Sequence, residues 1–123
     1  MNPKKILIVD DEVDLVETVR FPLEMEGHHV LVSYNGEDAL NQARKENPDL
    51  IILDLMLPKL DGYKVCRLLK FDERYKHIPI LMLTAKTQEK DKLLGKETGA
   101  DEYITKPFDM DELLKKVKAY LGK

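Results

Sequence analysis

The chain contains a single cysteine, Cys66, and therefore cannot form a disulfide bond within itself. A lone thiol fits the reducing interior of a cell, where structural disulfides are rare. The sequence also has no apolar run of about 18 residues, the length that crosses a bilayer. Its first residues, Met1 to Lys5, lead into a short apolar stretch without the hydrophobic region of a signal peptide. These absences predict a cytoplasmic protein with no membrane partner.

The sequence has little excess charge of either sign. Its 20 basic and 23 acidic residues give a formal net charge of -3, and no cluster of lysines and arginines forms a stripe. Direct binding to nucleic acid is therefore not expected. His28, His29 and His77 lack metal-ligand spacing with one another or with Cys66, so we assign them no role.

No Ser/Gly-rich linker or internal repeat divides the chain. With 123 residues and 43% hydrophobic content, it is long enough to bury the core of one ordinary globular domain. We therefore predict a single domain over residues 1–123, with no output domain in this chain.

Short apolar runs rich in β-forming residues alternate with helical patterns five times along the chain. Several of these runs are apolar throughout, which is typical of strands buried on both faces of a parallel sheet. Right-handed crossovers then predict an α/β fold, a doubly wound five-stranded parallel sheet with five helices in a three-layer sandwich. The predicted strands cover residues 5–10, 29–33, 49–54, 79–84 and 101–105.

The helical patterns differ in strength. Two segments have clear apolar faces, Leu15, Val16, Val19 and Leu23 in the first and Met110, Leu113, Leu114, Val117 and Leu121 in the last. Pro22 removes a backbone hydrogen bond from the first helix, so we expect a kink or an early break there. Residues 88–98 carry few apolar anchors and an internal glycine, so they predict a marginal, solvated helix.

Polar residues follow the predicted strands where ligands bind in open α/β sheets, beyond the carboxyl ends. They are Asp10 and Asp11 after the first strand, Asp54 after the third, Thr84 after the fourth and Lys106 after the fifth. Three carboxylates brought together repel one another unless a cation is present, and Mg²⁺ accepts such oxygen ligands. A carboxylate can also accept a phosphoryl group, with a metal ion, an ammonium and a hydroxyl neutralising its oxygens.

The segments IVDDE, LIILDLMLPKLDG, MLTA and YITKPF resemble the receiver family of two-component signalling, including its chemotaxis receivers, in order and in spacing. The resemblance covers essentially the whole chain. It implies the strand order 2-1-3-4-5 and a phosphorylation switch whose donor is a sensor histidine kinase or a phosphotransfer protein.

The same resemblance implies a role for each site residue. Asp54 is the expected phosphoacceptor, and Asp10 and Asp11 are expected to hold Mg²⁺ together with the backbone carbonyl of Met56. Mn²⁺, which takes the same ligands, is the alternative ion.

On the phosphoryl side, the resemblance implies that Thr84 and Lys106 contact the phosphoryl oxygens and that the bond from Lys106 to Pro107 is cis. Thr84 would move toward the phosphoryl group while Tyr103 turns inward. This movement would alter a surface that binds an unidentified downstream protein or, as a hypothesis, a second copy of the chain. That surface is expected to include Lys90, Lys92, Asp101, Tyr103, Glu112 and Lys116.

Two other functions stay open at this point. An aspartyl-nucleophile phosphatase also forms an aspartyl phosphate with Mg²⁺, but it needs a second acid two residues after the nucleophile, where this chain has Met56. We therefore do not expect a turnover enzyme. The second alternative is a phosphorylation-independent interaction module, although none of the expected site residues is replaced.

Single residues also have plainer interpretations. Asp11 could cap the first helix, with Asp14 as its partner three residues later. Cys66 lies in an apolar stretch and is expected to be a buried core thiol. The Lys/Glu run over residues 89–97 is most simply a solvated face.

Overall fold

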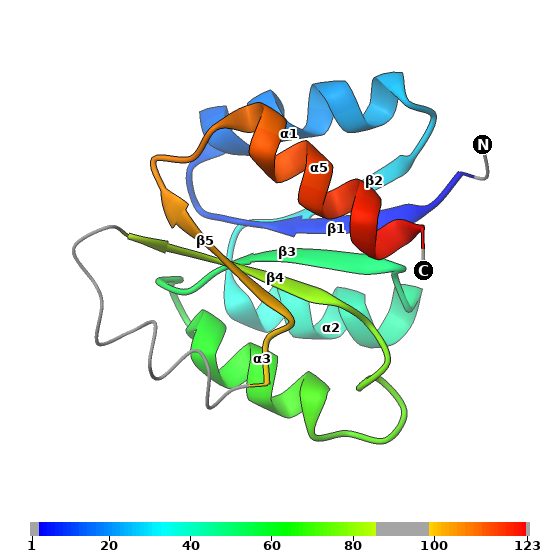
Figure 1. Cartoon of the computed structure of the whole chain (residues 1–123). Helices are drawn as coiled ribbons and strands as arrows, with labels where there is room; N and C mark the ends of the chain where they lie inside the picture. The colour runs from blue at the N-terminus through cyan, green and yellow to red at the C-terminus, as the bar shows by residue number, and fades with distance from the viewer. Residues whose placement is uncertain (1–2, 86–98, 123) are drawn as a thin grey trace.

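The computed structural model describes residues 3–85 and 99–122. Its centre is a five-stranded sheet in which every neighbouring pair is parallel, in the order β2-β1-β3-β4-β5 (Figure 1). The predicted doubly wound topology is confirmed. The strands are β1 (Lys5–Val9), β2 (His29–Ser33), β3 (Leu50–Asp54), β4 (Ile80–Ala85) and β5 (Glu102–Lys106).

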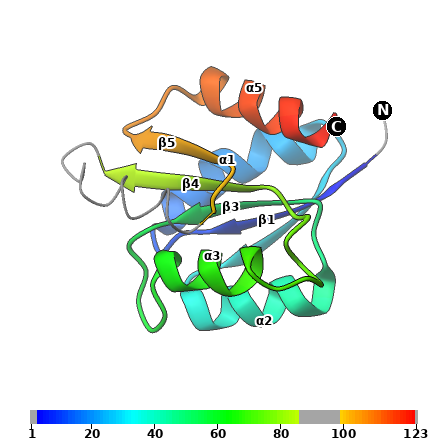
Figure 2. The ribbon, with the colours of Figure 1, turned by 60° about the horizontal axis from the view of Figure 1, so that its bottom comes forward.

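Helices cover both faces of the sheet. One face carries α1 and α5 and the other carries α2 and α3, so the described part of the chain forms three layers (Figure 2). The helices are α1 (Val13–Met25), α2 (Gly36–Glu46), α3 (Gly62–Lys70) and α5 (Met110–Leu121). The marginal helix predicted for residues 88–98 lies outside the described residues.

The core has two halves, one on each side of the sheet. Leu7 and Val9 of β1 point into the half covered by α2 and α3, while Ile6 and Ile8 point into the half covered by α1 and α5. All four side chains are completely buried. A strand with both faces buried has to be apolar throughout, which explains the continuous apolar runs. Cys66 lies in the first half of the core, as expected.

The first helix does not break at Pro22. It continues to Met25, so the alternative of an early break is wrong. A proline inside a helix removes one backbone hydrogen bond, here to the carbonyl of Thr18. The inner face of the helix, with Val19 and Leu23, is nevertheless buried against the sheet, and tertiary packing supplies most of a helix's stability.

Three of the four described helices begin with a side-chain cap. Asn35, Asp61 and Asp109 each accept a hydrogen bond from a backbone amide of the first turn of α2, α3 and α5. The exception is α1, whose N-cap residue Glu12 makes no such bond. Within the described residues, no helix is both long enough and apolar enough to span a membrane.

Candidate functional site

The carboxyl ends of the central strands bring the predicted polar residues to one edge of the sheet. Asp10 directly follows β1, Asp54 is the last residue of β3, and Lys106 is the last residue of β5. Oxygen atoms of Asp10, Asp11 and Asp54 all lie within 4.8 Å of one another. The structure thus assembles the acidic group that the strand ends predicted.

Lys106 reaches into this acidic group. Its Nζ lies 2.8 Å from Oδ2 of Asp10, where it donates a hydrogen bond, and 3.6 Å from Oδ1 of Asp54. The peptide bond between Lys106 and Pro107 is cis, as the family resemblance implied. Burial alone would lower the pKa of Lys106, but the hydrogen bond to Asp10 and the negative charges of Asp54 and Glu12 raise it above its usual value. The lysine is therefore a firmly protonated cation.

Asp54 is only 6% exposed, and its environment disfavours the ionised form. Burial, followed by the charge of Asp10, raises the pKa of Asp54 to about 6, against the opposing charge of Lys106 and a weak hydrogen bond from the amide of Met56. One ammonium does not fully compensate the carboxylates gathered here. A further cation would relieve this repulsion, and hard oxygen ligands of this type suit Mg²⁺ or Mn²⁺.

Thr84 supplies a buried hydroxyl near the same edge. Its strand neighbour Leu83 is paired in register with Asp54, and Thr84 itself is fully buried. Among residues 3–85 and 99–122, its Oγ1 has no hydrogen-bond partner. A buried polar atom without a partner is costly, and native structures contain few of them, so binding of a ligand is one explanation for this one. The hydroxyl is thus available for an oxygen-rich ligand bound at the strand ends, and the donor set fits a cation together with a phosphoryl group.

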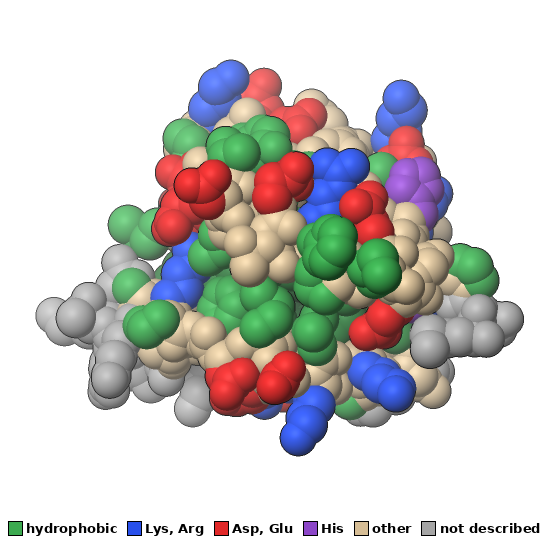
Figure 3. Space-filling view, turned by 90° about the horizontal axis from the view of Figure 1, so that it is seen from above, with side chains coloured by type: hydrophobic (Ala, Val, Ile, Leu, Met, Phe, Trp, Pro, Cys, Tyr) green, Lys and Arg blue, Asp and Glu red, His purple; other side chains and the backbone are tan. Residues whose placement is uncertain are grey.

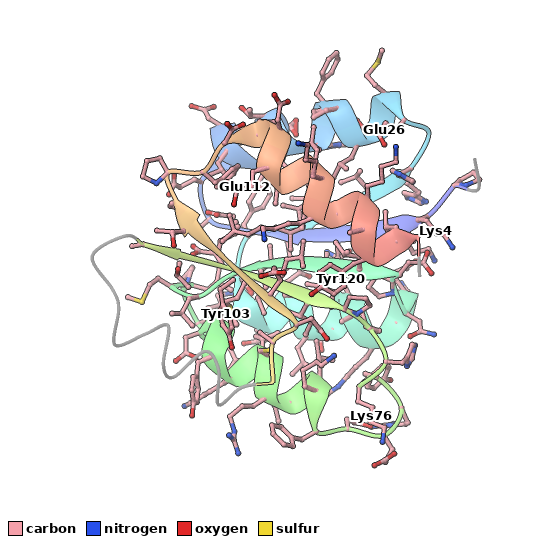
Figure 4. The ribbon with its side chains drawn as sticks, in the orientation of Figure 1. Lys4, Glu26, Lys76, Tyr103, Glu112 and Tyr120 are labelled. Atoms are coloured by element: carbon pink, nitrogen blue, oxygen red, sulfur yellow. The ribbon has the colours of Figure 1, made fainter. Side chains whose placement is uncertain are left out.

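Tyr103 lies on β5 beside Met82 of β4. Its ring is half-buried and packs against the half of the core that α2 and α3 cover, and Figure 4 shows it on the same side of the sheet as α3. In this structure the ring therefore already has apolar contacts within the fold.

The loop after β3 is held close to the site by two glycines. A Cβ on Gly62 would clash with the carbonyl oxygen of Asp54, and one on Gly36 would clash with that of Leu60. Gly62 also donates a backbone hydrogen bond of 2.9 Å to Leu55. These approaches fix the backbone on which Met56 lies, and only glycine permits them. Sequence reasoning did not detect these contacts.

Asp10 has a second task that sequence reasoning missed. Its Oδ1 accepts a hydrogen bond of 2.9 Å from the backbone amide of Glu12, the N-cap residue of α1, and so ties the start of that helix to the site. The interpretation of Asp11 as the cap of this helix is therefore wrong, because the N-cap residue is Glu12. Asp11 is exposed, and its carboxylate belongs to the acidic group instead.

The structure describes part of the surface that is expected to bind a partner. Glu112 is exposed at the start of α5 (Figure 4), whereas Lys116 lies 3.6 Å from Glu102. Asp101 is exposed, but its Oδ2 is already engaged, because it accepts hydrogen bonds from Nζ of Lys70 and from the amide of Ile80. Lys90 and Lys92 lie outside the described residues.

A cavity of about 490 Å³ opens beside Lys106, between the start of α1 and the connection from β5 to α5. It is lined by Glu12, Leu15, Thr18, Lys106, Pro107, Phe108 and Met110. Figure 3 shows the layer of α1 and α5 from outside, with hydrophobic side chains gathered in its middle and charged side chains around them. The ammonium of Lys106 is thus approachable from the α1 side of the site.

Comparison with known proteins agrees with this geometry. Residues 6–118 match the family model described as the response regulator receiver domain. The alkaline phosphatase synthesis transcriptional regulatory protein PhoP of Bacillus subtilis (strain 168) is 52% identical over 118 residues, which are 96% of this chain and 48% of that protein. The chain therefore spans about half the length of this relative.

Solved structures of similar proteins have the same fold. A putative response regulator from Chloroflexus aurantiacus superposes with a TM-score of 0.92 at 39% identity, covering 99% of this chain and 100% of that one. The chemotaxis response regulator CheY4 of Vibrio cholerae superposes with a TM-score of 0.88 at 34% identity, covering 97% and 99% of the two chains.

Proposed function

The chain belongs to the response regulator receiver domain family, and we propose on this basis that Asp54 accepts a phosphoryl group from a phosphohistidine donor. The donor is a sensor histidine kinase or a phosphotransfer protein. The observation that carries the proposal is the convergence of Asp10, Asp11 and Asp54 within 4.8 Å, with Lys106 in contact with two of the three. No other group of three potential ligands of this kind occurs among the described residues.

The cation in this proposal is Mg²⁺, with Mn²⁺ as a substitute. Asp10, Asp11, the carboxylate of Asp54 and the backbone carbonyl of Met56 would hold it, and when bound it would neutralise charge on the phosphoryl oxygens. The raised pKa of Asp54 and the surplus of carboxylates over ammonium groups support this assignment.

In the transfer step, an oxygen of the Asp54 carboxylate forms a bond to phosphorus as the bond from phosphorus to the imidazole nitrogen breaks. The electron pair of that bond leaves with the imidazole. Asp54 has to be ionised to act as the nucleophile, and Lys106 favours the ionised form. Lys106 and the hydroxyl of Thr84 then contact the transferred oxygens.

Phosphorylation is proposed to act as a switch through the same contacts. About two added negative charges attract the hydroxyl of Thr84, and Tyr103 turns further inward, which changes the surface that a downstream partner binds. That surface is proposed to include Lys90, Lys92, Asp101, Tyr103, Glu112 and Lys116. A second copy of the chain is the alternative partner. The output is then a change of binding partner, without turnover of a substrate.

The alternative of a phosphatase is less well supported by the site. Met56, at the position where such enzymes carry a second acid, has no ionisable side chain, and 58% of its surface is exposed. A general acid at this point is what would release product repeatedly.

Intact-protein mass spectrometry tests the proposed function. Wild type incubated with a small phosphoryl donor and Mg²⁺ should gain the mass of one phosphoryl group. Asp54→Asn should gain none, since it keeps the shape of the side chain but removes the nucleophile, and wild type with a chelator should also gain none. Asp72→Asn, a carboxylate paired with the exposed Arg74 and far from the site in sequence, is the matched control and should behave as wild type. No gain in wild type with any donor would favour the phosphorylation-independent interaction module.

A further inference from the structure

Three carboxylates, not two, surround the ammonium group of Lys106. Beside Asp10 at 2.8 Å and Asp54 at 3.6 Å, Oε1 of Glu12 lies 3.5 Å from Nζ. Asp10 and Asp54 are buried, whereas the side chain of Glu12 is 63% exposed. Glu12 therefore contacts the lysine from the solvent side, at the cavity that both residues line.

The position of Glu12 on α1 leaves its carboxylate without a structural task. Glu12 is the N-cap residue, but its side chain makes no capping bond, unlike those of Asn35, Asp61 and Asp109 at the other described helices. Its backbone amide is instead held by Oδ1 of Asp10. The backbone is thus anchored to the site, while the side chain extends toward Lys106.

A phosphoryl group on Asp54 would change the contacts that Lys106 makes with these carboxylates. Lys106 has to turn from its present partners toward the phosphoryl oxygens, because its single charge cannot be shared equally among all of them. The oxygens of Asp10 are taken by the cation under the proposed function. Glu12 is not part of the group of potential metal ligands, so its carboxylate stays available to the lysine.

We propose that Glu12 is a positioning residue that competes with the phosphoryl group on Asp54 for the ammonium of Lys106, and so weakens retention of the phosphoryl group. The inference rests on the proposed function and adds a regulating residue to the same site. The competition is purely electrostatic and involves no covalent step. It predicts that removing the charge of Glu12 strengthens the contact between Lys106 and a bound phosphoryl mimic.

Beryllofluoride, a tetrahedral phosphoryl mimic that binds aspartate carboxylates, provides the test. Its half-saturating concentration is measured by fluorine NMR at saturating Mg²⁺ for wild type, Glu12→Gln and the matched control Asp14→Asn. Asp14 has the same charge and lies in the first turn of the same helix. Exposed ion pairs are worth about 0.2–1 kcal/mol, so Glu12→Gln should bind beryllofluoride about 1.5- to 5-fold more tightly, whereas Asp14→Asn should match wild type.

A double-mutant cycle separates competition for Lys106 from direct repulsion between Glu12 and the anion. In a Lys106→Met background, Glu12→Gln should no longer change the affinity, because the group competed for is absent. Raising the ionic strength should also shrink the difference between Glu12→Gln and wild type, since exposed charges are screened. A purely structural role of Glu12 would show neither dependence.

The outcomes distinguish this inference from the function on which it rests. Failure of wild type to bind beryllofluoride would overturn the proposed function and the inference together. If wild type binds but Glu12→Gln binds equally well or more weakly, the proposed function stands and the inference is wrong. The inference is also wrong if the gain from Glu12→Gln persists without Lys106.

Discussion

The two ends of the sheet each carry a pair of lysine and aspartate, and the two pairs are built differently. At the amino end, Nζ of Lys70 donates to Oδ2 of Asp101 and to the carbonyl oxygens of Lys76 and Ile78. Asp101 in turn accepts from the amide of Ile80. Lysine and aspartate are matched one to one there, and backbone groups complete the hydrogen bonding.

At the carboxyl end, Lys106 faces three carboxylates, and the buried hydroxyl of Thr84 has no partner among the described residues. The pKa of Asp54 is raised because burial and the charge of Asp10 outweigh Lys106. At the amino end, the charges and hydrogen bonds of the pair are satisfied within the chain. At the carboxyl end, excess negative charge and the hydroxyl of Thr84 remain for a ligand to satisfy. Substitutions at the two ends should therefore have different consequences.

The largest effect is expected at the amino end. Asp101→Ala leaves Lys70, whose side chain is only 11% exposed, without its counter-charge and leaves the amide of Ile80 without this acceptor. The free energy of unfolding should fall by about 2–4 kcal/mol. Chemical denaturation measures it. Asp72→Ala, which removes a pair with the exposed Arg74, should cost less than about 1 kcal/mol. Equal losses in the two variants would show that the amino-end pair is no more than a surface pair.

Replacing a carboxylate of the site is expected to raise the free energy of unfolding, not to lower it. In the folded chain, burial and the neighbouring carboxylates disfavour the negative charge of Asp54, and Asp54→Asn removes that charge. In the presence of a chelator, the variant should therefore have a higher free energy of unfolding than wild type at neutral pH. The pKa of Asp54 is raised from 3.8 to about 6. At about 1.4 kcal/mol per unit, reduced for partial solvent access, the expected gain is about 1–3 kcal/mol. A loss of stability in this variant would mean that the negative charges of the site are already compensated without a ligand.

The pH dependence of that gain follows from linkage. Well below pH 3.8 Asp54 is protonated in both states and contributes nothing. As the pH rises toward about 6, the unfolded chain has released the proton while the folded chain retains it, so the stability of metal-free wild type falls. The difference between Asp54→Asn and wild type should therefore be near zero around pH 4, grow toward pH 6 and level off above it. Denaturation at several pH values measures this difference, and a pH-independent difference would contradict the assignment.

Addition of Mg²⁺ should stabilise the folded protein by neutralising the carboxylates at the carboxyl end of the sheet. At roughly ten to thirty times its dissociation constant, a cation that binds only the folded state stabilises it by about 1.4–2 kcal/mol. Wild type and Asp72→Asn should show this gain in thermal or chemical unfolding, and Asp54→Asn should show little of it. Equal stabilisation of all three proteins would place the cation elsewhere.

The smallest expected effect concerns the starts of the helices. Asn35 accepts a capping bond from the amide of Asp38, so Asn35→Ala should cost about 1 kcal/mol of stability. Glu12→Ala should cost less than about 0.5 kcal/mol, because the side chain of Glu12 makes no capping bond to α1. A larger loss in Glu12→Ala would give that side chain a structural role and weaken the inference that it acts on Lys106.

Much of this architecture could be predicted because it depends on patterns along the chain. Apolar runs such as residues 50–53 specify strands buried on both faces, and right-handed crossovers align their carboxyl ends. Polar residues after those strands then have to meet, which is why Asp10, Asp54 and Lys106 could be brought together from the sequence.

Other features depend on contacts that no local pattern encodes. Lys70 and Asp101 are 31 residues apart, and Lys106 and Glu12 are 94 apart, so their contacts follow only from how the layers pack. The close approach of Gly62 to the carbonyl of Asp54 is likewise a property of the folded loop. The helix past Pro22 persists because burial of its inner face outweighs a local rule.

The central claim is that the unbalanced carboxylates at the carboxyl end serve phosphoryl transfer to Asp54. Reduction of the phosphorylated chain with borohydride, which converts an aspartyl phosphate to homoserine, followed by peptide mapping, tests it most directly. The account predicts homoserine at position 54 alone, and none when the donor or the divalent cation is omitted. Homoserine at Asp10, Asp11 or another carboxylate, or none after incubation with donor and Mg²⁺, would contradict it.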